Sequence, residues 1–372
     1  MRYYIIAGEA SGDLHGSNLV REIRELSPVS EFRGWGGDLM QSAGVTLVKH
    51  FRDLAFMGFI EVVKNLPTIL RNLSFCKQDV STYQPDVLIL IDYPGFNLRI
   101  AEWAHNKGIK IIYYISPQVW AWKESRVKKI RKHVDRMLVI LPFEKSFYEK
   151  WQYDATYVGH PLVDVIERYQ DTGDTRPLSD RPIIALLPGS RKQEILVKLP
   201  VMLAVSKRFP EYQFIVAQAP GQEDAFYSGL LSGYKNVSGI TNQTYRLLSQ
   251  AKAALVTSGT ATLETALFGV PEVVCYKGSN ISYQIAKRLI KIKYISLVNL
   301  IMDKLVVKEL IQDEMNEKNL SAELRLLLND ADRRRQLSAD YAALRNLLRQ
   351  GGDASRNAAR IVVEFSKEVT LS

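Results

Sequence analysis

Short, continuous apolar runs alternate with helical patterns along this sequence, and this feature constrains its fold most. The runs are Tyr3–Ala7, Val87–Ile91, Lys110–Ile115, Arg136–Leu141, Ala155–Val158, Ile183–Leu187, Gln213–Ala217, Ala253–Val256 and Glu272–Cys275. Strands that are apolar throughout are typical of parallel sheets covered by helices on both faces. The regular succession of such strands and helices predicts repeated βαβ units and an α/β fold class.

The chain length predicts two domains. The chain has 372 residues, and a domain usually holds roughly 100–200 residues. The segment 169–181 is polar and contains Gly, Pro, Ser and aspartates, which predicts a linker. We therefore expect a first domain over 1–168, joined by a C-terminal helix within 350–372, and a second domain over 182–349. Ligands of such folds bind at the carboxyl ends of strands, so we expect the active site in the cleft between the domains.

The composition narrows the class of partner. The formal net charge of +9 favours phosphate, nucleic acid or an acidic membrane surface. The two cysteines lie far apart, so we expect neither a disulfide framework nor a zinc cluster, and a reducing cytoplasm fits. The beginning of the chain does not resemble a signal peptide, and no run reaches the roughly 18 apolar residues of a transmembrane helix. Any membrane contact is therefore expected to be peripheral.

The first strand leads into a glycine-rich acidic loop, GEASGD at residues 8–13. Its glycines allow a sharp turn and close approach to a ligand. The N-terminus of the next expected helix, Leu14–Leu26, favours an anion at the same place. Ser11 and Asp13 are also good N-cap residues, so a capped turn is the alternative. Glu9 has no role in such a turn, which favours a functional loop.

A second glycine cluster, GWGGD at residues 34–38, does not support a nicotinamide-dependent enzyme. It does not fit G-x-G-x-x-G and does not follow the first strand. A dinucleotide fold would also need an acidic residue about 20 positions after that fingerprint. We predict a close-packed turn here.

Asp92 follows the buried strand 86–91 and begins the sequence DYPGFN. A carboxylate at the end of a buried parallel strand lies where catalytic groups usually lie. Partial burial raises the pKa of such a carboxyl toward that of a useful general base. The alternative is an aspartate that begins a Pro-Gly turn.

The loop after the next strand contains SPQVWAW at residues 116–122. Tryptophan rings in such a loop either stack on a sugar or an acyl chain or fill the core. A basic helix is expected beyond it. Its cations form either a solvated face or a surface for anionic lipid or phosphate, and they are Lys123, Arg126, Lys128, Lys129, Arg131, Lys132 and Arg136.

Two loops in the second half of the chain have the chemistry of a diphosphate site. Arg191 follows the strand Ile183–Leu187, and its planar guanidinium can pair with phosphate oxygens in a bidentate manner. Small hydroxyl residues and a glycine open a helix after the strand Ala253–Val256, a phosphate cradle. Glu264, one turn into that helix, can accept hydrogen bonds from a ribose diol, although Glu is also common in first helical turns. The cradle residues are Ser258, Gly259, Thr260 and Thr262.

An apolar stretch over residues 54–75 has near-helical spacing. It predicts either a core-facing helix or an exposed face that contacts membrane or acyl chains. Pro67 is expected to divide it into two helical pieces. The residues that we predict to contact membrane or acyl chains are Met57, Phe59, Val62, Val63, Leu66, Ile69, Leu70 and Leu73.

Taken together, these motifs resemble those of the lipid-A-disaccharide synthase family. The matching motifs run in order from the first strand to about residue 311. They are GEASGD (8–13), RGWGGDLMQSAG (33–44), MGFIEV (57–62), IDYPGFN (91–97), YISPQVWAW (114–122), LPFE (141–144), VGHPLVD (158–164), LPGSRKQEI (187–195), SGTATLETAL (258–267) and SLVNLI (296–301).

This resemblance implies a GT-B fold, with two Rossmann-like domains whose parallel sheets face an inter-domain cleft. It implies an inverting glycosyltransferase that joins UDP-2,3-diacylglucosamine to 2,3-diacylglucosamine 1-phosphate, giving a β-1,6-linked disaccharide 1-phosphate and UDP. It also implies that no metal cofactor is needed. We expect an enzyme that binds peripherally to the cytoplasmic face of the inner membrane and does not bind nucleic acid. The resemblance also allows a homodimer through the C-terminal region, and the sequence does not decide between a dimer and a monomer.

The resemblance also implies roles for single residues. Asp92 is expected to act as the base, with Glu9, Asp13 and His15 as competitors for that role. Arg191, the cradle Ser258–Thr262, Glu264 and Asn299 are expected to bind the nucleotide side of the donor. The GEASGD loop then faces the sugars instead of the nucleotide. The residues expected in loops on the acceptor side are Ser11, Gly12, Asn97, Gln118 and Trp120.

Other classes of protein remain as alternatives. One is another UDP-sugar enzyme of the GT-B fold, such as the lipid II-type glycosyltransferase or UDP-N-acetylglucosamine 2-epimerase. Another is a peripheral membrane-binding or nucleic-acid-binding protein without catalytic activity. The net charge fits the second class, but it does not explain acidic and hydroxyl residues at so many strand ends.

Overall fold

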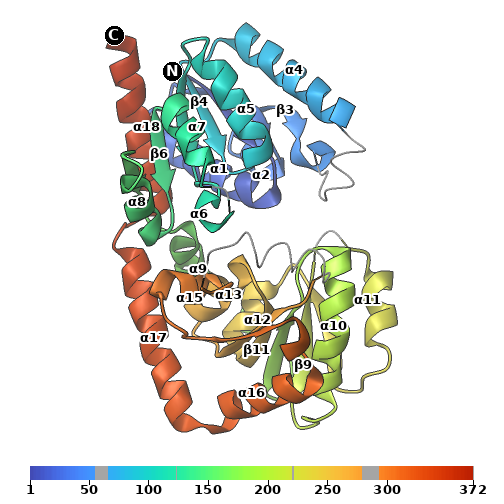
Figure 1. Cartoon of the computed structure of the whole chain (residues 1–372). Helices are drawn as coiled ribbons and strands as arrows, with labels where there is room; N and C mark the ends of the chain where they lie inside the picture. Colours follow the sequence, from blue (N-terminus) through green and yellow to red (C-terminus); the bar gives the residue numbers. More distant parts are fainter. Residues whose placement is uncertain (55–65, 123, 220–221, 279–292, 372) are drawn as a thin grey trace. The chain divides into compact units, whose positions relative to one another are not determined.

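The computed structural model describes all residues except 55–65, 123, 220–221, 279–292 and 372. The chain divides into two compact units (Figure 1). The first contains Met1–Pro161 and Leu348–Ser372, and the second contains Leu162–Leu347. Each unit is built on its own parallel sheet, as expected from the apolar runs of the sequence.

The first sheet has seven strands in the order β3-β2-β1-β4-β5-β6-β7. Its central strands bury nearly every residue, which explains why they are apolar throughout. The strands are β1 (Arg2–Ala7), β2 (Glu31–Gly36), β3 (Thr46–His50), β4 (Val87–Ile91), β5 (Lys110–Tyr114), β6 (Arg136–Val139) and β7 (Ala155–Tyr157).

Helices cover both faces of this sheet. Tyr3 and Ile5 of β1 point into a core formed with α1 and α18. Tyr4 and Ile6 point to the opposite face, into a core formed with α4, α5, α7 and α8. The helices of this unit are α1 (Ala10–Leu26), α2 (Asp38–Ser42), α4 (Leu66–Tyr83), α5 (Pro94–His105), α6 (Val119–Trp122), α7 (Arg126–His133), α8 (Pro142–Glu149) and α18 (Ala354–Leu371).

The second sheet has six strands in the order β10-β9-β8-β11-β12-β13. Helix α12 packs on one face, where Leu247 and Leu248 join the core of the central strands. Helices α10 and α16 pack on each other, and α16 contacts β11, β12 and β13. The strands are β8 (Ile183–Leu187), β9 (Gln213–Gln218), β10 (Val237–Thr241), β11 (Ala251–Thr257), β12 (Glu272–Tyr276) and β13 (Lys308–Ile311). The helices along 161–349 are α9 (Pro161–Thr172), α10 (Lys192–Ser206), α11 (Asp224–Leu231), α12 (Thr244–Gln250), α13 (Thr260–Leu267), α15 (Leu297–Met302), α16 (Glu317–Asn329) and α17 (Ala331–Arg349).

The prediction of a turn at residues 34–38 is wrong, because Gly34 and Gly36 lie in strand β2. The strand packs so closely against β1 that a Cβ atom on Gly34 would overlap the carbonyl oxygen of Ile5. Gly34 therefore allows close strand packing, whereas a Cβ atom on Gly36 would overlap the side chain of Met40. Strands β3, β10 and β13 were not predicted, because their sequences are short and interrupted by polar residues.

The polar segment 169–181 is not a loose linker. The ring of Tyr169 packs against Tyr245 and Phe268 of the second unit. The guanidinium and amide groups of Arg246 and Gln250 donate to the carbonyl oxygen of Arg176. The division between the compact units therefore falls earlier, between residues 161 and 162.

The C-terminal helix α18 is a structural part of the first unit. It packs along α1, and Val362 and Phe365 lie in the core beneath it. Tyr3 of β1 and Ser366 of α18 form a buried hydroxyl–hydroxyl hydrogen bond of 2.8 Å. The N-terminal strand is thus tied to the end of the chain.

Truncation of Phe365 should test this packing. Phe365→Ala removes a side chain that is 6% exposed, and we expect a loss of about 3–5 kcal/mol in the free energy of unfolding, measured by urea denaturation. Phe75→Ala is the matched control, since Phe75 is 44% exposed and should lose only about 1 kcal/mol. Equal losses in the two variants would contradict a core role for α18.

Candidate active site

The order of the strands selects one place in each sheet for a ligand. In the first sheet, β2 and β3 lie on one side of β1, and the later strands from β4 onward lie on its other side. The same change of side occurs between β8 and β11 in the second sheet. Loops leave these neighbouring strands in opposite directions, so a crevice opens at their carboxyl ends. The GEASGD loop and Asp92 follow β1 and β4, whereas Arg191 and the Ser258–Thr262 cradle follow β8 and β11.

Asp92 lies on a strained backbone at the end of β4. Asp92 and Tyr93 both have left-handed conformations, with φ of 42° and 50°, which non-glycine residues rarely adopt. Hydrogen bonds hold the carbonyl oxygen of Asp92, one from the Tyr113 hydroxyl at 2.6 Å and one from the Asn97 amide at 2.8 Å. Such strain persists only where the surroundings determine it, and it is common at active sites.

The carboxyl group of Asp92 lies close to a second acidic residue, Glu9. Burial raises its pKa to about 7, and the negative charge of Glu9 contributes to this increase. Glu9 follows β1, and Ala7 and Ile91 are paired in the sheet, so the two loops leave at the same level. Gly8 makes this approach possible, because a Cβ atom there would overlap the ring of Tyr93. The geometry therefore brings Glu9 and Asp92 together.

Asp13, predicted as a catalytic residue, is buried and forms hydrogen bonds with the scaffold. Its carboxylate accepts hydrogen bonds from the backbone N–H groups of Gly37, Leu39 and Met40, at 2.8, 3.1 and 2.9 Å. These groups begin helix α2, so Asp13 caps that helix from a distance in sequence. Ser11, Gly12 and Asp13 lie in the first turn of α1, which begins at Ala10 rather than at the predicted Leu14. Ser11 is exposed, whereas Gly12 is buried.

Asn97 also holds the backbone, although it was predicted in the acceptor loops. It is fully buried, and its amide nitrogen donates to the carbonyl oxygens of Ile91 and Asp92. It therefore supports the position of Asp92 from below. Its place within α5, one turn after the strand end, made this role hard to distinguish in the sequence from substrate contact.

The loop after β5 rests on a buried carboxyl group. The indole N–H of Trp120 donates to Glu144 at 3.2 Å, and the Leu141 backbone N–H donates to it at 3.0 Å. Burial raises the pKa of Glu144 to about 8. Trp120 is 9% exposed, so it fills the core rather than presenting a stacking surface, whereas Gln118 is exposed. Ile115, just before this loop, is a further strained residue with φ of 64°.

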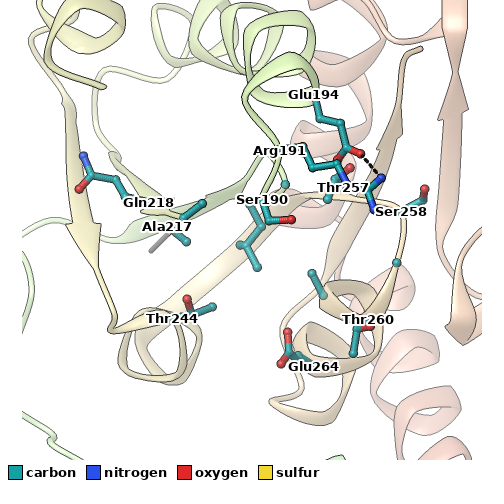
Figure 2. Close-up of a pocket in the computed structure, with 15 residues that line it drawn as sticks. Ser190, Arg191, Glu194, Ala217, Gln218, Thr244, Thr257, Ser258, Thr260 and Glu264 are labelled. Atoms are coloured by element: carbon teal, nitrogen blue, oxygen red, sulfur yellow. Dashed lines mark hydrogen bonds and ion pairs between the residues drawn. The ribbon is translucent and has the colours of Figure 1, made fainter. Parts of the chain in front are cut away.

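The second unit contains a pocket of about 450 Å³ at the ends of β8 and β11. The predicted residues that line it are Arg191, Ser258, Gly259, Thr260 and Glu264. Figure 2 shows Arg191 beside Glu194, Thr257 and Ser258, with Glu264 projecting from α13. Tyr245 donates to Glu264 at 3.2 Å, and burial raises the pKa of Glu264. An arginine, a helix N-terminus and a carboxylate thus line one concave surface, as a nucleotide site requires.

Two predicted nucleotide ligands do not line this pocket. Thr262 is fully buried, and its hydroxyl donates to the carbonyl oxygen of Gly259 at 2.8 Å. Asn299 is also fully buried. Its amide nitrogen donates to Val307 and Glu309, and its oxygen accepts from the backbone of Val306 and Val307. These internal hydrogen bonds connect α15 to the segment 306–309, and the role of Asn299 as a direct ligand stays a prediction.

The sequence reasoning missed other pocket residues. Glu194 lies beside Arg191, while Gln218 and Thr244 come from the end of β9 and the start of α12. Gln218 is the last residue of its strand. Its position at the end of a strand beside β8 could have indicated a pocket residue. That inference requires the order of the strands in the sheet, which the sequence alone does not give.

The predicted membrane-contact stretch is only partly within the described residues. Met57, Phe59, Val62 and Val63 lie outside them, and for Leu66 the structure describes only the backbone, at the start of α4. Within α4, Leu73 is buried and Ile69 packs against the core, whereas Leu70 is 58% exposed. The described part is therefore mainly a core-facing helix, with one exposed apolar residue among those predicted. Among the described residues, no helix is long and apolar enough to cross a bilayer.

Comparisons with known proteins decide between the remaining alternatives. Residues 3–363 match the family described as lipid-A-disaccharide synthetase. The chain is 41% identical to the lipid-A-disaccharide synthase of Geobacter metallireducens, over 98% of this chain and 97% of that protein. It is 40% identical to that of Syntrophus aciditrophicus, with the same coverage of 98% and 97%.

The chain belongs to the lipid-A-disaccharide synthetase family. As a member of this family it is a glycosyltransferase of lipid A biosynthesis that acts on lipid-linked sugars, and the resemblance read from its motifs is confirmed. The epimerase, lipid II-type and non-catalytic alternatives are correspondingly disfavoured.

Solved structures support the fold class. A glycosyltransferase of kitacinnamycin has a TM-score of 0.69 at 16% identity, covering 98% of both chains. UDP-GlcNAc 2-epimerase from Neisseria meningitidis has a TM-score of 0.67 at 13% identity, covering 99% of this chain and 100% of that one. At such low identity these similarities concern the fold alone, and they confirm two Rossmann-like units of the GT-B class.

Replacing Asp13 should show whether this residue stabilises the fold, in contrast to Glu9 of the same GEASGD segment. In Asp13→Asn one acceptor oxygen becomes an N–H donor, leaving at least one buried backbone N–H of α2 without a partner. We expect a loss of about 1–3 kcal/mol in the free energy of unfolding, measured by urea denaturation. Glu9→Gln should change it by less than about 0.5 kcal/mol. Unchanged stability of the Asp13 variant would contradict the capping role.

Proposed function

We propose that this glycosyltransferase transfers 2,3-diacylglucosamine from UDP to the 6-hydroxyl of 2,3-diacylglucosamine 1-phosphate. The products are the β-1,6-linked disaccharide 1-phosphate and UDP. The donor linkage is α and the product linkage is β, so the reaction is a single displacement with inversion. The observation that carries the proposal is the partly buried carboxyl group of Asp92, with its pKa raised to about 7, on a strained strand end beside Glu9.

In this mechanism Asp92 takes the proton of the acceptor 6-hydroxyl. The acceptor oxygen forms its bond to the anomeric carbon as the bond from that carbon to the diphosphate oxygen breaks. A base with pKa near the working pH is effective because it is substantially deprotonated yet still attracts a proton. The hydrogen bonds from Tyr113 and Asn97 to the Asp92 backbone support this role, since they fix the carboxyl group before the substrate arrives.

The pocket of the second unit binds the UDP part of the donor and stabilises it as it leaves. Arg191 and the N-terminal N–H groups of α13 are positive where negative charge develops on the diphosphate. Glu264 accepts hydrogen bonds from the ribose hydroxyls in place of the one from Tyr245. This arrangement supplies the charge stabilisation without a metal ion.

Lipid-linked substrates require access to a membrane surface. We infer peripheral binding at the cytoplasmic face of the inner membrane. The exposed cations of α7 support this, because Lys128, Lys129, Arg131 and Lys132 are exposed while Val127 and Ile130 are buried. Such a basic helix attracts anionic headgroups. A homodimer through the C-terminal region remains a separate prediction.

An assay with both lipid substrates tests the proposal. The chain is incubated with UDP-2,3-diacylglucosamine and 2,3-diacylglucosamine 1-phosphate in the presence of EDTA, and disaccharide and UDP are quantified. We expect both products in equal amounts. The absence of disaccharide with and without EDTA would exclude the proposed reaction. Activity that EDTA alone abolishes would exclude its metal-independent form.

Asp92→Asn tests the assignment of the base. The amide is close in shape to the carboxylate but cannot accept the proton, so kcat should fall by at least about 10²-fold. Binding of UDP, measured by calorimetry, should be unchanged because the donor pocket lies on the other sheet. Normal turnover with normal UDP binding would rule out Asp92 as the base.

A further inference from the structure

A lysine lies buried beneath the pocket of the second unit. The Lys198 side chain is 4% exposed, although lysine is seldom buried unless its charge is paired. Its ammonium group donates to the Thr257 hydroxyl and, at 3.4 Å, to Oε2 of Glu194. Burial lowers the pKa of Lys198 and the charge of Glu194 opposes that change. The pocket lining described above does not include Lys198.

Lys198 completes a row of alternating charges. Oε1 of Glu194 accepts from Arg191 at 3.3 Å, while Oε2 of the same carboxylate accepts from Lys198. Glu194 lines the pocket, so its negative charge would repel a diphosphate bound there. With Lys198 present the row carries one net positive charge. Without Lys198, Arg191 and Glu194 would only neutralise each other.

The second hydrogen bond of Lys198 joins the two walls of the pocket. Thr257 is the last residue of β11 and directly precedes Ser258, whereas Lys198 and Glu194 lie on α10, which follows β8. The lysine therefore connects the two loops at the point where the strand order reverses. The Arg191 loop and the Ser258–Thr260 cradle share a single buried cation.

We propose that Lys198 is a positioning residue that neutralises Glu194, so that Arg191 and the α13 N-terminus present net positive charge to the diphosphate of the donor. This inference rests on the proposed role of the pocket in UDP binding. Lys198 itself acts through Glu194 and Thr257. It balances the charge of Glu194 from beneath the site, without touching the ligand itself.

Lys198→Met tests the inference, because methionine keeps most of the side-chain volume and removes the charge. We expect the Kd for UDP, measured by calorimetry, to rise about tenfold, a typical coupling for contacting charged groups. In Glu194→Gln/Lys198→Met the unbalanced carboxylate is gone, and the Kd should return to within about threefold of the wild-type value. Lys207→Met, which removes an exposed charge at the end of the same helix, should bind UDP as the wild type does.

Several outcomes would overturn the inference. One is wild-type affinity in a folded Lys198→Met variant. Another is equal weakening in the single and double variants, which would indicate packing rather than charge. Should Lys198→Met fail to fold, Glu194→Gln alone decides: UDP affinity at least equal to wild type supports charge balance, and a tenfold loss contradicts it. If the wild type does not bind UDP at all, the donor pocket itself is wrongly assigned.

Discussion

The reversal of strand order in each parallel sheet is the constraint on which the site depends. Adjacent strands β1 and β4, and likewise β8 and β11, end at the same edge while their following helices pass to different faces. At such positions the loops diverge, which favours a ligand site at the carboxyl ends of the strands. The sequence places its acidic loops after β1 and β4 and its arginine and hydroxyl loops after β8 and β11. The first unit thus carries Glu9 and Asp92 at its switch point, and the second carries Arg191 and hydroxyl groups.

Within these loops, polar residues divide into those used by the scaffold and those left for chemistry. Asp13, Asn97, Thr262 and Asn299 are buried, and each forms at least one side-chain hydrogen bond with the backbone. Buried polar groups need such partners, because an unpaired one costs about 1–3 kcal/mol. Asp92 differs in that the side chains of Tyr113 and Asn97 hold its backbone carbonyl oxygen. Its strained conformation is stabilised by neighbours that leave the carboxyl group with a pKa suited to proton transfer.

The sequence was sufficient to predict the two-unit parallel α/β fold, because buried strands such as Val87–Ile91 and Ile183–Leu187 are apolar throughout. It also predicted that Asp92 and Arg191 follow such strands, and the structure places them there. It did not reveal strand β2, whose Gly34 allows close packing against β1. It also did not separate Asp13 or Asn299 from catalytic groups, since Asp and Asn are equally suited to capping and to ligand binding. That distinction depends on partners distant in sequence, which only the folded chain shows. The sequence did not indicate a role for Lys198 for the same reason, since its partner Thr257 is distant in sequence.

The pH dependence of kcat/KM, compared between the wild type and Glu9→Gln, tests the central claim most directly. If Asp92 is the base, the raised pKa means that activity is full above about pH 7 and is lost as the pH falls through that value. Removing the Glu9 charge lowers the pKa of Asp92, so the acidic limb should move to lower pH in the variant. A wild-type profile that is flat between pH 5 and 8, or an acidic limb that Glu9→Gln does not move, would contradict the pairing of these two carboxyl groups as the catalytic centre.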